Sequence, residues 1–264
     1  MNTISKYVRL LGRYTKLSIL DLKEFPFEIF MKSLSLGFDV VFVFLFWTSI
    51  HNLGISYEGW NKYEIFILAG CSTISDAIAQ LTFGFRDIEY TVLKGNFDNY
   101  LMRPVNPIFS IMAEKFFIFW VVGEIIIGFL MILISATIGH LVIRNIFCAI
   151  LIIVFSTFAF RFIYGTISLM CFWYGKCDSL RDIIFSIDIA KNYPMDIFGR
   201  FVFNIFIYVL PISMMATIPA KIMLNKEKHI YLLLTISILL FVFWIIIFHL
   251  VFKKALLKYQ STGS

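Results

Sequence analysis

Four ionisable residues lie inside long apolar stretches of this sequence: Asp39, Asp76, Glu124 and Arg161. A charged side chain within a bilayer is costly unless it is paired, faces water or serves a function. We expect Arg161 to pair with Asp76 or Asp39, because the three residues lie at a similar depth, counted from the same side. Such residues suit three roles: an ion pair that holds helices together, the lining of a substrate path, or a proton relay.

The remaining sequence offers no constellation for covalent catalysis. It has no G-x-x-x-x-G-K-[ST] loop for ATP phosphates, no H-E-x-x-H motif and no G-x-S-x-G motif. Its cysteines form no C-x-x-C pair and are expected to be free thiols: Cys71, Cys148, Cys171 and Cys177. Basic residues are not interleaved with aromatic residues as in a nucleic-acid surface. We therefore expect a chain that is not an enzyme, with no metal, no cofactor of its own and no nucleic-acid partner.

Hydrophobic residues make up 60% of the 264 residues, compared with about 45–50% in soluble domains. They cluster in stretches of about 20 residues, the length of a helix that crosses a bilayer. The sequence predicts an all-α, polytopic membrane protein with a six-span transmembrane domain over residues 27–260. The approximate spans are 28–50, 62–84, 108–135, 146–172, 201–223 and 230–252.

Residues 1–26 have a different pattern. Apolar residues recur at alternating steps of four and three from Ile4 to Leu22, and most basic residues fall off that stripe. This pattern predicts a basic amphipathic helix in the membrane interface. Further basic residues gather at the ends of the apolar stretches on the same side, so the positive-inside rule places both termini in the cytoplasm.

The segment 176–194 permits two topologies. Its apolar residues share one helical face, and the other face carries Arg181, Asp182, Asp188 and Lys191. Hydropathy favours a helix at the cytoplasmic interface, followed by a fifth span over 201–223. In the alternative, 176–194 crosses the bilayer with its charges facing the bundle. Pro211 and Pro219 would then kink the next apolar stretch or make it re-entrant.

A polar segment at 85–107 separates the second and third apolar stretches. Residues 88–93 have room for one or two helical turns, which Gly95 ends because glycine tolerates positive φ. Residues 98–102 can form a second short helix, which Pro104 stops. A short, mixed-charge element of this kind fits either a surface gripped by a soluble partner or an ordinary solvated loop.

Within this segment, the sequence from Gly95 to Pro107 reads GNFDNYLMRPVNP. It resembles a pattern that follows the second span of bacterial ABC exporter permeases of the ABC-2 type, G-x-(L/F)-D-x-x-L-x-R-P-x-x-P. The six-span layout extends this resemblance over nearly the whole chain. In that family the segment is the coupling element that docks on the ATPase subunit. The resemblance therefore implies a coupling role for Glu89, Lys94, Gly95, Asp98, Leu101, Arg103 and Pro104.

The resemblance further implies the permease subunit of an ATP-driven exporter in the bacterial cytoplasmic membrane. Two such chains, identical or related, would dimerise to form the translocation path, and partner ATPase subunits would bind ATP and Mg. Two other functions remain open: an ion-coupled secondary transporter that uses the intramembrane Asp, Glu and Arg residues, and a non-transporting membrane scaffold or immunity protein. An indispensable ATPase contact at 85–107 distinguishes the exporter from both.

Overall fold

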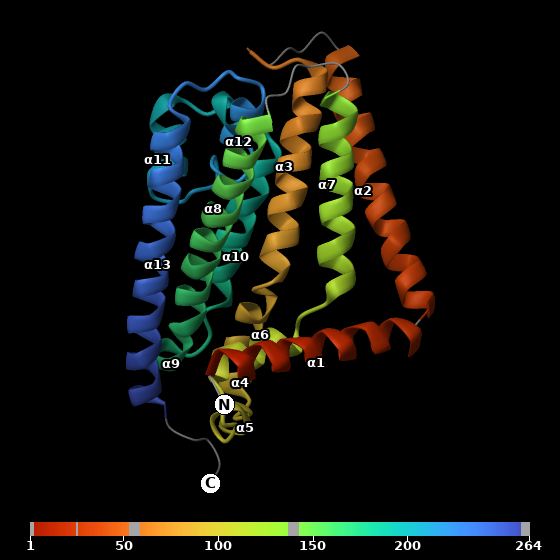
Figure 1. Ribbon diagram of the computed structural model, residues 1–264. Coiled ribbons are helices and arrows are strands. Elements are labelled where there is room, and N and C mark those ends of the chain that lie inside the picture. The colour runs from red at the N-terminus through yellow and green to blue at the C-terminus, as the bar shows by residue number, and fades with distance from the viewer. Residues whose placement is uncertain (1–2, 25, 53–58, 137–142, 260–264) are drawn as a thin grey trace.

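The computed structural model describes residues 3–24, 26–52, 59–136 and 143–259. All regular structure within these ranges is helical, which confirms the expected all-α class. Long helices run side by side as a bundle, and the N-terminal helix α1 (Thr3–Glu24) lies across one end of it (Figure 1).

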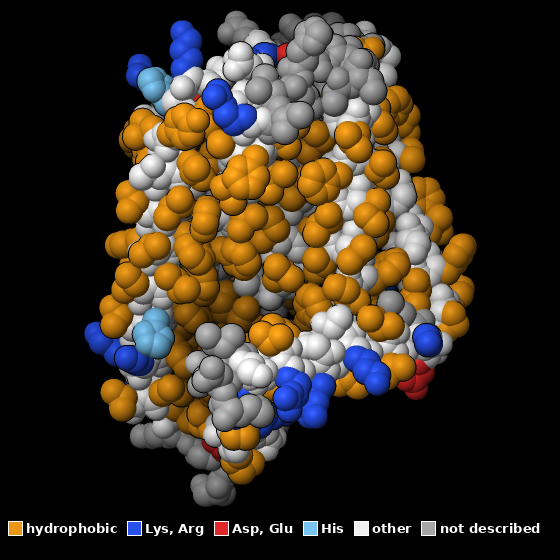
Figure 2. All heavy atoms as spheres, viewed as in Figure 1, with side chains coloured by type: hydrophobic (Ala, Val, Ile, Leu, Met, Phe, Trp, Pro, Cys, Tyr) orange, Lys and Arg blue, Asp and Glu red, His pale blue; other side chains and the backbone are white. Residues whose placement is uncertain are grey.

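Among the described residues, four helices are each long and apolar enough to cross a membrane. They are α2 (Pro26–Asn52), α7 (Ile118–Ala136), α8 (Ile143–Leu169) and α13 (Ile230–Lys258). A fifth candidate is α3 (Lys62–Gln80) taken with its continuation to Leu93, at a bend of 58°. Figure 2 shows hydrophobic side chains over the middle of the bundle and Lys and Arg at both ends. This is the surface of a multi-pass membrane protein.

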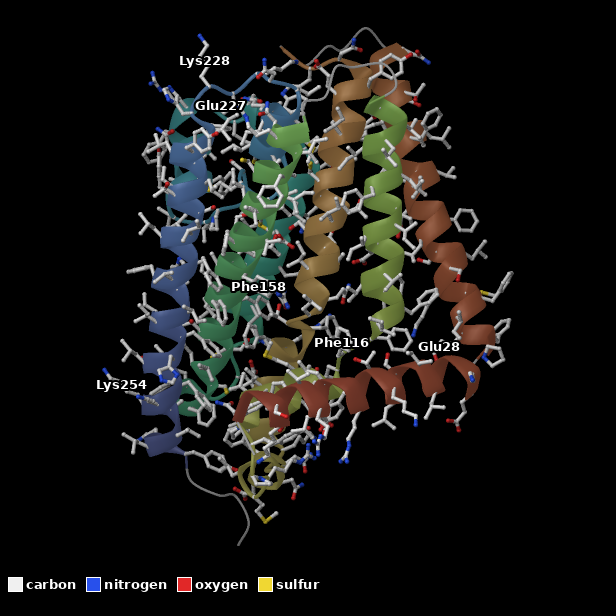
Figure 3. The ribbon with its side chains drawn as sticks, viewed as in Figure 1. Glu28, Phe116, Phe158, Glu227, Lys228 and Lys254 are labelled. Atoms are coloured by element: carbon white, nitrogen blue, oxygen red, sulfur yellow. The ribbon has the colours of Figure 1, made fainter. Side chains whose placement is uncertain are left out.

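The start of α1 and the end of α13 lie at the same end of the bundle (Figure 1). Lys254 of α13 marks this end, whereas Glu227 and Lys228 lie at the opposite end (Figure 3). This placement puts both ends of the described chain on one side of the hydrophobic zone. That this side is cytoplasmic stays a prediction.

Glycine allows α3 and α7 to approach closely. A Cβ atom added to Gly70 would lie 2.7 Å from the backbone oxygen of Gly128, and one added to Gly128 would lie 2.8 Å from the oxygen of Gly70. Small residues at helix interfaces are common in membranes, because they let backbones pack directly. α8 and α13 pack through larger groups instead, with the ring centroids of Phe162 and Phe248 5.4 Å apart.

The third apolar stretch begins its long helix later than the expected span 108–135. A short helix, α6 (Pro107–Glu114), comes first, and α7 starts only at Ile118. Helix α1 stabilises this break, because the Ser18 hydroxyl oxygen accepts the N–H of Ile118 at 3.1 Å. That N–H lies in the first turn of α7, where no intrahelical partner is available.

The expected continuous span over 201–223 is wrong. The structure has two separate helices there, α11 (Arg200–Tyr208) and α12 (Thr217–Met223). Pro211 lies in the turn between them, where its missing N–H and its restriction of the preceding residue oppose continuation of α11. Pro219 lies in the first turn of α12, where a helix does not need the N–H.

A series of short helices connects α8 to this turn: α9 (Cys171–Tyr174), α10 (Asp178–Asp188), η2 (Ile189–Asn192) and η3 (Met195–Ile197). The series runs from the end of the bundle near α1 towards the opposite end (Figure 1). Arg181 and Lys191 are buried, whereas Ile183 and Phe185 are exposed. A helix that faces lipid has its charges inside and its apolar side chains outside. The structure therefore favours the alternative arrangement of 176–194, with Arg181, Asp188 and Lys191 facing the bundle, although Asp182 is exposed.

We expect Gly128→Ala to lower the melting temperature of the purified chain in detergent, since overpacking of a close contact costs about 1–3 kcal/mol. The matched control is Gly37→Ala in α2, whose added Cβ would meet nothing within 4 Å. The control should melt at or slightly above the wild-type temperature. Equal melting temperatures for the two variants would contradict the close α3–α7 contact.

Candidate functional site

Residues 83–114 form a projection at the end of the bundle near α1, which we call the tip. It consists of η1 (Phe83–Asp87), α4 (Ile88–Leu93), α5 (Phe97–Leu101) and α6. Helices α4 and α5 lie beyond α1, farthest from the middle of the bundle (Figure 1). The two short helices expected at 88–93 and 98–102 are both present, the second starting one residue earlier.

Buried aromatic packing holds the tip on the bundle. Phe97 is fully buried, and its ring centroid lies 5.4 Å from that of Phe172 in α9 and 5.1 Å from that of Tyr259, which follows α13. Gly95 has a φ of 72° and ends α4, so the chain can turn into α5. This packing argues against an ordinary solvated loop.

Helix α1 braces the tip from the side. Lys6 donates a hydrogen bond to the carbonyl oxygen of Pro104, and the N–H of Asn106 donates to the Tyr7 hydroxyl at 3.1 Å. The ring of Tyr7 also meets Phe109 edge to face, with centroids 4.7 Å apart. The amphipathic helix and the polar segment, distant in sequence, are therefore one structural unit.

Inside the tip, the Glu114 carboxylate ties α6 to α5. It accepts the Tyr100 hydroxyl at 2.6 Å and pairs with Arg103. Burial and this hydrogen bond raise the pKa of Tyr100 to about 12, and the contact with Glu114 raises the pKa of Arg103. Burial and the Asp98 carboxylate likewise raise the pKa of Tyr259 to about 12. These groups keep their protons at neutral pH, so the contacts persist.

The predicted coupling residues are not equally accessible. Three are exposed on the tip: Lys94, Leu101 and Pro104. Three more are partly buried: Gly95, Asp98 and Arg103.

Sequence reasoning missed the apolar part of this surface. Tyr90, Leu93 and Met102 are exposed on the tip, and Met102 is the most accessible of them at 76%. The signal in the sequence was the presence of large apolar side chains in a segment otherwise rich in charged and turn residues. Together with Leu101, they give the tip an apolar patch at the polar end of the molecule.

Glu89 does not lie on this surface, contrary to its expected contact with an ATPase, because its side chain is only 3% exposed. It forms an ion pair with Arg181 of α10 at 3.0 Å and accepts the N–H of Cys177 at 3.0 Å. Arg181 also pairs with Asp178 and donates to the carbonyl oxygen of Arg86 at 2.8 Å. Glu89 therefore connects the tip to α10.

A second charged cluster lies among the long helices. Lys191 of η2 pairs with Asp76 of α3 at 2.9 Å and with Asp188 at 2.6 Å. Sequence reasoning missed Lys191 as the partner of Asp76, because hydropathy favoured a place for it at the membrane interface. The buried cation of Lys191 instead joins η2 to α3.

Within the described residues, Arg161 forms an ion pair with neither Asp76 nor Asp39, so the expected pair is wrong. Its Nε donates to the Thr82 hydroxyl at 2.9 Å, and a second guanidinium nitrogen donates to the Thr82 carbonyl at 3.3 Å. Thr82 follows the end of α3, where free carbonyls and the helix dipole favour a cation. Arg161 therefore stabilises the bend below α3.

Asp39, Asp76 and Glu124 line one cavity of about 370 Å³ between α2, α3 and α7. Of these, Asp76 has the ion pair with Lys191. Asp39 and Glu124 have no cationic partner in the part of the chain that the structure describes. Glu124 accepts only a long hydrogen bond, 3.4 Å, from the amide of Gln80. The cavity thus brings together three of the four predicted intramembrane charges, while Arg161 lines a different cavity of about 100 Å³ with Asp76 and Asp188.

The apolar bundle, with four helices long and apolar enough to cross a membrane among the described residues, defines an all-helical, multi-pass membrane protein. A family model for ABC-2 family transporter proteins matches residues 37–263, and the chain belongs to that family. It is thus a permease component of ABC transporters, a family that associates with ABC ATPases. The comparison with curated proteins finds no match.

We expect Arg181→Leu to destabilise the chain by about 3–5 kcal/mol, because it leaves the buried Glu89 carboxylate uncompensated. The double variant Glu89→Leu/Arg181→Leu removes both charges and should regain most of that loss. Thermal unfolding of the purified chains in one detergent measures both effects. A double variant with the summed loss of the two single variants would show that the pair is not coupled.

Proposed function

We propose that this chain is the membrane-spanning subunit of an ATP-driven exporter in the bacterial cytoplasmic membrane. In this proposal the tip docks on separate ATPase subunits, which bind ATP and Mg. Two permease chains, identical or related, enclose the translocation path. The energy source thus lies outside this chain, consistent with the lack of a phosphate-binding loop in its sequence.

The apolar patch of the tip carries the proposal. Tyr90, Leu93, Leu101 and Met102 are exposed at the polar end of the molecule, beyond α1. Exposed apolar groups on an ordered surface outside the lipid zone are typical of a protein interface. Lys94 adds a cation beside this patch, with its Nζ 5.9 Å from the ring centroid of Tyr90.

Two ion pairs support transmission of movement from the tip into the bundle. Glu89 attaches α4 to α10 through Arg181, and Lys191 attaches the end of the same stretch to Asp76 of α3. A displacement of the tip by closing ATPases would therefore be passed to the wall of the cavity. Breaking the first pair would leave the buried Glu89 carboxylate without a cation, and breaking the second would do the same to Asp76, so the elements are expected to move together.

The low burial of α2 within this chain is evidence for a second permease chain. Only 6% of its apolar stretch is buried, and it presents large side chains such as Phe38, Val41 and Leu45 outward. A second chain against this face would bury them and place the cavity beside the interface. The basic side chains of α1 support a cytoplasmic location for the tip.

We expect Leu101→Glu/Met102→Glu to reduce recovery of the ATPase by about tenfold or more, since hot-spot residues at an interface contribute at least about 2 kcal/mol each. The measurement is co-purification of the tagged permease with the ATPase subunits encoded beside it in its genome. The quantity is the molar ratio of ATPase to permease.

The matched control is Tyr231→Glu, which places the same charge on a residue that is 65% exposed at the start of α13, at the opposite end of the bundle from the tip. It should recover the ATPase as well as wild type does. Equal recovery with the tip variant, or no ATPase with wild type, would refute docking at the tip and reopen the ion-coupled carrier and the scaffold.

A further inference from the structure

The cavity between α2, α3 and α7 combines two chemical features. One wall carries carboxylates, Asp39 from α2 and Glu124 from α7, and the other end carries aromatic rings. Its volume of about 370 Å³ lies within the range of small-molecule sites. The cavity is thus large enough for an organic molecule of modest size.

The carboxylate of Glu124 is the independent sign of a ligand. The side chain is nine-tenths buried, with 9% exposed, yet its Oε2 atom has no hydrogen-bond partner. Buried polar atoms in native proteins are nearly always satisfied, so an unsatisfied one that lines a cavity marks a place for a partner. Asp39 faces the same space, also without a cation among the described residues.

Asp76 also lines the cavity, but unlike Asp39 and Glu124 it has a cationic partner. Its charge is compensated by Lys191, which also pairs with Asp188. The two carboxylates without an ion pair among the described residues, Asp39 and Glu124, therefore lie on the side of the cavity formed by α2 and α7. A ligand that completes this site carries positive charge.

The aromatic end of the cavity indicates what else the ligand carries. Phe46, Trp47 and Tyr193 contact one another edge to face, with ring centroids 5.3 to 6.4 Å apart. Aromatic faces bind organic cations and apolar groups, whereas they do not coordinate metal ions. Moreover, the described residues contain no group of three or more His, Cys, Asp or Glu that could hold a metal ion.

We propose that this cavity binds an amphiphilic organic cation, with its charged group between Asp39 and Glu124 and its apolar part against Phe46, Trp47 and Tyr193. The cation belongs to the class of substrate that the exporter carries, a role that rests on the function proposed above. Binding itself requires neither nucleotide nor ATPase. The proposal can therefore be tested on the permease alone.

The test uses the full chain in lipid nanodiscs and radiolabelled tetraphenylphosphonium, with tetraphenylborate as an anion of nearly the same shape. Equilibrium dialysis measures the saturable binding above that of empty nanodiscs. The expected result is saturable binding of the cation and none of the anion. Glu124→Gln should weaken cation binding by about tenfold or more, the loss for removing one desolvated charge partner.

Three further variants isolate the charge. Glu124→Asp keeps the carboxylate and should bind within a few-fold of wild type. Asp39→Asn should also weaken binding, and it changes an exposed side chain without an ion pair, so it tests the proposal even where Glu124→Gln does not fold. Glu227→Gln, at the opposite end of the molecule from the tip (Figure 3), should bind as wild type does.

Several outcomes would overturn the proposal: no saturable binding of the cation, equal binding of the cation and the anion, or unchanged binding by both Glu124→Gln and Asp39→Asn. Failure of the site is distinguishable from failure of the exporter. Recovery of an ATPase without cation binding would reject the site and leave the permease intact. Cation binding without recovery of an ATPase would reject ATPase docking and leave the site.

Discussion

The cost of a buried charge constrains the central part of this molecule. Arg181 and Lys191 lie on one stretch of short helices, and each is neutralised from another part of the chain, by Glu89 of the tip and Asp76 of α3. Separation of either pair within an apolar bundle would leave a charge whose desolvation is not repaid. The tip, α10 and α3 are therefore held to one another by electrostatics, in addition to their apolar packing.

This constraint gives the tip a mechanical connection that its surface alone would not provide. The tip is packed through Phe97 on α9 and on Tyr259, which follows α13, and it contacts α1 through Tyr7 and Lys6. Its outer surface has exposed apolar side chains, while Glu89 on its inner side pairs with Arg181 of α10. The connection continues from Lys191 to Asp76, which also lines the cavity.

Much of the candidate site could be predicted from sequence, because its local features depend on residue types at short spacings. Gly95 and the prolines that follow it delimited the short helices, and Asp39, Asp76 and Glu124 stood out as charges in apolar stretches. Their partners could not be predicted in the same way. The choice of Lys191 for Asp76, and of a helix end for Arg161, depends on which helices pack together, and one sequence does not contain that information.

The sequence by itself determined the all-helical class, the approximate positions of α2, α3, α8 and α13, the amphipathic α1 and the resemblance to ABC-2 permeases. Long apolar stretches must form helices in lipid, because no other local structure satisfies the backbone there. Only the tertiary structure decided that α7 begins after a break, that 201–223 folds as two helices, and that Glu89 faces inward. The first and the last of these depend on contacts with distant segments, Ser18 with Ile118 and Glu89 with Arg181, which one sequence does not reveal.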